Sequence, residues 1–156
     1  MAQVLDEETS LPLLKHAFDC GINTWDTADT YSNGVSERLI RKAIEKYSIP
    51  RSQLVLMTKC YFGVDDEPSN PRNDALMTSK DGAMANRTGL SRKHIFDAVE
   101  ASIERLGTYI DVLQIHRLDD STPPKEIMRA LNDIVERGWV RYIAASSMAC
   151  WQLQSW

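Results

Sequence analysis

The sequence has 156 residues, 43% of them hydrophobic and 26% charged, which is the composition of one ordinary globular domain. Its net charge is −4 and its Lys and Arg residues form no long run, so we expect neither nucleic acid nor an anionic membrane as a partner. Three cysteines without metal-ligand spacing, an acidic start and the absence of a long apolar run predict a cytoplasmic protein with reduced thiols and no bound metal.

Hydrophobic periodicity and capping residues divide the sequence into alternating helices and strands. The first part predicts a helix capped by Thr9 or Ser10, a strand over 22–28, a helix over 36–47 and a buried strand over 54–58 that runs into Lys59. The second part predicts a helix over 91–106, a strand over 109–115, a helix over 122–137, a strand over 140–145 and the start of a helix over 149–156. This alternation is typical of βα units, in which helices cover a parallel sheet.

One polar stretch, 63–89, interrupts this alternation and is too long for an ordinary connection in a compact domain. It is either an insertion without function or a lid over a site. Because it leaves the carboxyl end of a predicted strand, its position favours the lid.

Each predicted strand ends at a side chain that can carry chemistry: Asp26, Lys59, His116 and Ser146. Any one of them could be a turn acid, an exposed strand end or a buried histidine without a catalytic role. Ligands and catalytic groups gather, however, at the carboxyl ends of the strands in parallel βα architectures. Four such residues at equivalent places therefore predict a site.

These side chains, with Tyr31, form a set that could transfer a proton. The Tyr31 phenol can donate to a nascent alkoxide, and an ammonium such as Lys59 beside it favours the phenolate. Asp26 could hold Lys59 by an ion pair, and a neutral His116 could orient a substrate carbonyl. None of these residues carries a hydride, so reduction needs a cofactor, and no GxGxxG motif follows a predicted strand.

The segments DTADTY, LVLMTKC, YIDVLQIHR and VRYIAASS resemble the signature segments of the aldo-keto reductases, which are NADPH-dependent (β/α)8-barrel enzymes, and are most similar to the fungal type. The resemblance implies reduction of an aldehyde or ketone to an alcohol by hydride transfer from NADPH, with a small-molecule carbonyl compound as substrate. It implies a catalytic tetrad of Asp26, Tyr31, Lys59 and His116, with Tyr31 as the general acid.

The resemblance also implies that Ser146 and Ser147 contact the cofactor, although Ser147 stands where the family has Asn. Trp25 and Tyr61 lie next to tetrad positions and either wall a substrate pocket or pack in the core. Asp119 and Asp120 follow His116, but two loop acids are usually solvated and do not predict a metal site.

The expected fold class is α/β, of the (β/α)8 TIM-barrel family, with about four parallel βα units in one partial domain over 1–156. A complete barrel takes roughly 250 residues, and the resemblance places these strands second to fifth. An alternative function is a non-catalytic binding or regulatory barrel, and a further alternative is an inactive truncated fragment. Open barrel edges predict self-association of this chain.

Overall fold

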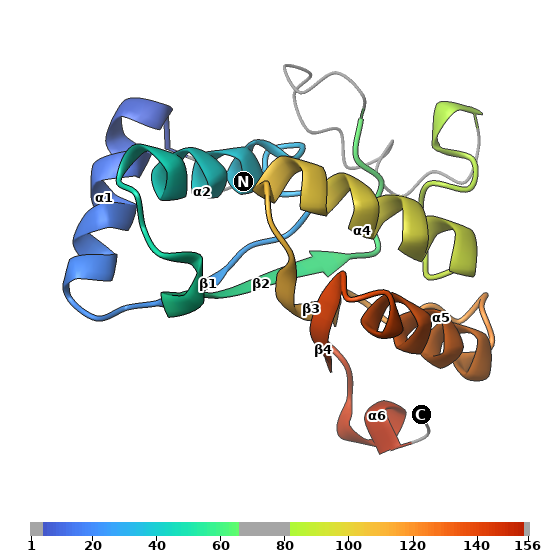
Figure 1. The fold of residues 1–156 in the computed structure, drawn as a ribbon. Coiled ribbons are helices and arrows are strands. Elements are labelled where there is room, and N and C mark those ends of the chain that lie inside the picture. Colours follow the sequence, from blue (N-terminus) through green and yellow to red (C-terminus); the bar gives the residue numbers. More distant parts are fainter. Residues whose placement is uncertain (1–4, 66–81, 155–156) are drawn as a thin grey trace.

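The computed structural model of the protein describes residues 5–65 and 82–154. Within them, four parallel strands form one sheet in the order β1-β2-β3-β4 (Figure 1). The strands are β1 (Thr24–Asp26), β2 (Val55–Cys60), β3 (Ile110–Ile115) and β4 (Val140–Ala145). The α-helices are α1 (Glu7–Asp19), α2 (Val35–Lys46), α4 (Arg92–Leu106), α5 (Pro124–Glu136) and α6 (Cys150–Gln154), and the short 3-10 helices are η1 (Arg51–Gln53) and η2 (Gly82–Met84).

The predicted alternation of helices and strands is confirmed, as is the parallel sheet, but several boundaries differ. The first helix begins at Glu7 because the Asp6 carboxylate accepts a hydrogen bond from the Thr9 amide at 2.8 Å. Hydrogen bonds from Thr9 also lower the pKa of the Asp6 carboxyl below its ordinary value. Thr9 and Ser10 therefore lie inside the helix, and their prediction as caps is wrong.

The strand boundaries shift in a way that affects the site. The first strand covers only Thr24–Asp26 of the predicted 22–28, while the second extends to Cys60, so that Lys59 lies within β2. Most of the stretch 63–89 lies outside the described residues, and the lid remains a prediction.

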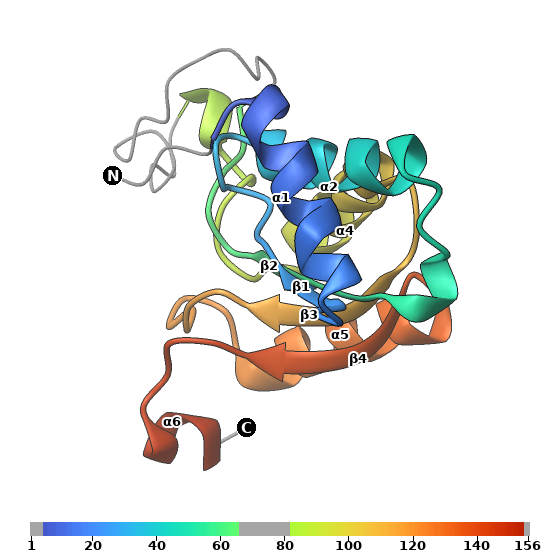
Figure 2. The ribbon, with the colours of Figure 1, turned by 90° about the vertical axis from the view of Figure 1, so that its left-hand side faces the viewer.

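The core lies between the sheet and the helices, as Figure 2 shows for α1, α2 and α4 on one side of the strands. Buried side chains that point from the strands toward the helices belong to Trp25, Leu56, Leu113 and Ile115. They pack with apolar side chains of α4 and α5, among them Ile95, Val99, Ile127 and Ile134. Among the described residues, no helix is long and apolar enough to cross a bilayer.

The opposite face of the sheet is open. Asp26, Met57, Val112 and Tyr142 form one row across the four strands, and their side chains point away from the helices. Tyr142 is 71% exposed, and Val55 in the next row is 39% exposed. Among the described residues, β1 and β4 each pair with one strand only, so both edges of the sheet carry unpaired backbone groups.

We expect residues 1–156, produced alone, to self-associate, because the open face exposes Val55 and Tyr142 and the two sheet edges are available to other copies. Size exclusion with light scattering should show broad, early elution, together with strong binding of a dye specific for exposed apolar surface. The Tyr142→Glu variant should bind less dye than the unsubstituted chain. A sharp monomer peak with cooperative thermal unfolding would contradict this expectation.

Candidate active site

The carboxyl ends of β1 and β2 bring Asp26 and Lys59 together. The Lys59 ammonium lies 2.5 Å from Asp26 Oδ2 and donates a second hydrogen bond to the Thr27 carbonyl oxygen at 2.9 Å. The Lys59 side chain is 7% exposed, whereas that of Asp26 is 50% exposed. A buried ammonium needs such partners, so the ion pair fixes the Lys59 side chain in place.

Tyr31 reaches the same place from the loop between β1 and α2. The loop turns through left-handed backbone at Ser32, Asn33 and Gly34, with φ of 47°, 54° and 83°, before α2 begins. The turn returns Tyr31 to the sheet, where Lys59 Nζ lies 5.2 Å from the centroid of its ring. The ammonium therefore faces the phenol at a distance where the two interact.

His116 completes the cluster from the first position after β3. Its amide donates to the Cys60 carbonyl oxygen at 3.0 Å, which continues the ladder between β3 and β2. Its ring is nearly buried and meets the Tyr31 ring edge-on, with centroids 5.8 Å apart, and the Phe62 ring at 5.1 Å. The structure thus brings all four predicted tetrad residues together at one edge of the sheet.

Ser146 and Ser147 follow β4 at the same edge. The Ser146 amide donates to the Ile115 carbonyl oxygen at 2.9 Å, and the two serine hydroxyls lie 3.3 Å apart. Ser147 is exposed and has φ of 54°, in the left-handed region that Asn and Gly adopt more readily than Ser. The backbone at 147 therefore suits the Asn that the sequence lacks.

The aromatic residues next to the tetrad differ in what they face. Trp25 is 6% exposed and packs in the core, where its indole nitrogen donates to the Ile22 carbonyl oxygen. It also lines a pocket that Asp26 shares with side chains of α1 and α2. Tyr61 meets Phe62 edge-on at 5.0 Å. Sequence reasoning missed Phe62, although its place two residues after the end of β2 could have suggested it.

Asp119 anchors the chain around the site. Its carboxylate accepts hydrogen bonds from the Leu90 and Ser121 amides and from the hydroxyls of Ser121 and Thr122. Burial alone would raise the pKa of Asp119, but the hydrogen bonds from Ser121, Leu90 and Thr122 lower it below its ordinary value. This acid is therefore an anchor between the start of α4 and the loop after β3.

A buried ion pair supports the site from behind. Glu37 of α2 is fully buried and accepts a hydrogen bond from the Thr58 hydroxyl at 2.7 Å and from Arg105 Nε at 2.6 Å. It thereby connects α2, β2 and α4. A Cβ atom at Gly34 would lie 2.7 Å from Arg105 Cδ, so the turn that carries Tyr31 packs directly against this pair.

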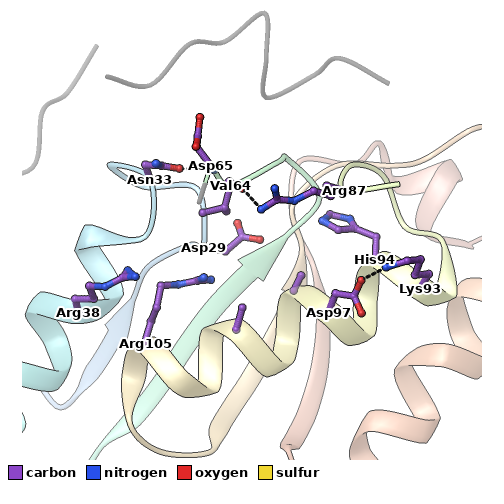
Figure 3. Close-up of a pocket in the computed structure, with 12 residues that line it drawn as sticks. Asp29, Asn33, Arg38, Val64, Asp65, Arg87, Lys93, His94, Asp97 and Arg105 are labelled. Carbon is purple, nitrogen blue, oxygen red and sulfur yellow. Dashed lines mark hydrogen bonds and ion pairs between the residues drawn. The ribbon is translucent and has the colours of Figure 1, made fainter. Parts of the chain in front are cut away.

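Figure 3 shows a second feature of this region, a pocket of about 380 Å³ on the helix side of the sheet. Arg38 of α2, Arg105 of α4 and the fully buried Asp29 line it, and the tetrad residues do not. Burial raises the pKa of the Asp29 carboxyl well above its ordinary value, and the nearby Glu37 raises it further. Sequence reasoning did not foresee this buried acid, because its burial depends on how α2 and α4 pack.

The partial (β/α)8 barrel gathers Asp26, Tyr31, Lys59 and His116 at the carboxyl ends of its strands, which is where proteins of this fold place their sites. The model of the aldo/keto reductase family matches residues 2–156. The chain therefore belongs to the aldo/keto reductase family.

Individual relatives agree with this assignment. The chain is 62% identical over 152 residues to versiconal hemiacetal acetate reductase of Aspergillus parasiticus, a match that covers 97% of this chain and 44% of that protein. It is 57% identical over 159 residues to aldo-keto reductase dtxS3 of Metarhizium robertsii, covering 97% and 42% of the two chains. The chain therefore spans less than half the length of these curated relatives.

Solved structures show the same relation. The holo form of aldo-keto reductase AKR11C1 from Bacillus halodurans superposes with a TM-score of 0.77 at 26% identity, covering 96% of this chain and 45% of that one.

The open face of the sheet lies where a complete barrel would have its interior. The remaining part of the barrel can be supplied by the Aspergillus reductase. We call the hybrid barrel the protein in which residues 1–156 replace the matching 44% of that reductase.

We expect the Asp29→Asn variant of the hybrid barrel to melt at a higher temperature than the parent at pH 7. The folded state keeps this buried carboxyl protonated above about pH 3.9, where an unfolded Asp ionises, so stability falls as the pH rises past that value. Asn removes that loss, and the difference in melting temperature between variant and parent should grow from about pH 4 upward.

The control for this measurement is Asp97→Asn, which changes a more exposed acid that lines the same pocket and pairs with Lys93. Asp97→Asn should not stabilise the protein. An Asp29→Asn variant that melts below its parent at pH 7 would contradict the expected protonation of Asp29.

Proposed function

We propose that the protein to which this chain belongs reduces an aldehyde or ketone to an alcohol with NADPH, and that Tyr31 is the general acid. The observation that carries the proposal is the arrangement of Lys59, Tyr31 and His116. The buried Lys59 ammonium lies 5.2 Å and the His116 ring 5.8 Å from the centroid of the Tyr31 ring, at the carboxyl edge of the sheet. Family membership and the reductase names of the relatives support the reaction class.

In the proposed reaction the Tyr31 hydroxyl gives its proton to the carbonyl oxygen of the substrate, and a new C–H bond forms at the carbonyl carbon. When bound, NADPH supplies the hydride for that bond. Lys59 stabilises the phenolate that Tyr31 becomes, because the ammonium lies close to its ring. Asp26 holds Lys59, and His116 orients the carbonyl oxygen toward Tyr31.

The residues at the end of β4 fit the nicotinamide end of the cofactor. Ser146 and Ser147 present two neighbouring hydroxyls at the edge where the tetrad lies, and hydroxyls both donate to and accept from a carboxamide. We propose that these two serines hold the carboxamide group.

The Tyr31→Phe variant of the hybrid barrel should lose about 10²- to 10⁴-fold in kcat for an aromatic aldehyde, the usual contribution of a general acid. Binding of NADPH should remain close to that of the parent, because only the transition state needs the proton. Steady-state kinetics and a fluorescence titration measure the two effects, and Lys59→Met should behave similarly.

The same experiment separates the alternatives. A non-catalytic binding barrel would bind NADPH without turnover in the parent, and an inactive fragment would give neither. Reduction by the Phe variant within a fewfold of the parent would remove Tyr31 from the role of general acid.

The Ser147→Asn variant should lower the KM for NADPH by about 2- to 10-fold with little change in kcat. Asn restores an amide donor worth one neutral hydrogen bond and accepts the left-handed backbone at this position more readily. Ser147→Ala is the matched control and should not improve the KM. An equal gain from both variants would show that the amide group is not the cause.

A further inference from the structure

We infer that Gln114 is a positioning residue for the proposed reaction, acting through Asp26. The inference rests on the proposed function, since it concerns the same site. Gln114 lies near the end of β3, and its Nε2 donates a hydrogen bond to Asp26 Oδ1 at 2.6 Å.

The contact gives Asp26 a partner at each oxygen. Gln114 holds Oδ1, while Oδ2 faces the Lys59 ammonium at 2.5 Å. A carboxylate that is 50% exposed has room to rotate and to exchange its partner for water. With Oδ1 fixed, Oδ2 keeps its direction toward Lys59.

The sheet register explains how this contact forms. Gln114 is the register partner of Lys59, whereas Asp26 is the partner of Met57, two residues earlier in β2. The hydrogen bond therefore passes over β2 on the open face of the sheet and joins β1 to β3 diagonally. Lys59 lies beside both partners, so the three side chains form one group on the face that the helices do not cover.

The chemistry of an amide suits this place better than its alternatives. A neutral donor restrains Asp26 without competing with Lys59 for its negative charge, as a second ammonium would. An acid at this position would put two carboxylates against each other, and an aliphatic side chain would leave Oδ1 without its donor. Lys59 would then hold a less ordered counterion beside Tyr31.

The test uses the hybrid barrel with Gln114→Met, which keeps a similar length and removes the donor. We expect kcat to fall about 10- to 100-fold, the range for losing a hydrogen bond to a charged group, with the KM for the aldehyde changed less than twofold. Gln53→Met is the matched control: Gln53 is exposed in η1, just before the amino end of β2 and therefore at the opposite end of that strand from Lys59, and its substitution should leave kcat unchanged.

A double-mutant cycle distinguishes positioning from general support of the fold. If Gln114 acts through Asp26, Gln114→Met should cause no further loss of kcat in an Asp26→Asn background. An independent loss in that background would overturn the inference, as would a kcat within twofold of the parent for the single variant.

A second readout does not depend on turnover. The side-chain amide protons of Gln114 should resonate downfield of those of the other glutamines in the parent, and Asp26→Ala should abolish that shift. An unshifted Gln114 amide in an active hybrid barrel would refute the inference alone. A parent hybrid barrel that reduces no carbonyl compound would refute the proposed function, and this inference with it.

Discussion

The site depends most on the hydrogen bonds that the buried Glu37 carboxylate accepts. Glu37 belongs to α2, and its carboxylate accepts from the Thr58 hydroxyl of β2 and from the Arg105 guanidinium of α4, so one side chain joins three elements. Removing one partner of a buried ion pair typically costs about 3–5 kcal/mol, because the other charge is left without compensation. The turn that carries Tyr31 leads directly into α2, and the position of the phenol therefore depends on this charge as much as on the sheet.

The sheet contributes a different constraint. Its strands are parallel, so their carboxyl ends meet at one edge, and side chains that are distant in the sequence come together there. This is why the ends of the strands could be recognised as a site before any geometry was known. The alternation of side chains along a strand explains why Trp25 lies in the core. Neighbouring residues of a strand face opposite sides, so Trp25 faces the helices while Asp26 faces the site.

What the sequence could not show depends on packing between elements. The Asp6 cap was missed because Thr9 and Ser10 are equally good caps, and only the path of the chain selects among them. The burial of Asp29 follows from the way α2 and α4 meet above the loop, which no local pattern records. The contact between Gln114 and Asp26 joins strands that are not neighbours, and the register that permits it is set by the whole sheet.

The close packing of Gly34 against Arg105 has a consequence for how such sequences can change. A Cβ atom at position 34 would lie 2.7 Å from Arg105 Cδ, so Arg105 would have to shift, and the shift would reach Thr58 through the Glu37 carboxylate that Arg105 and Thr58 share. Substitutions at these four positions, which lie on three separate elements and one turn, should therefore be accepted together or not at all. In an alignment of relatives they are expected to covary as one unit, independently of the tetrad that they support.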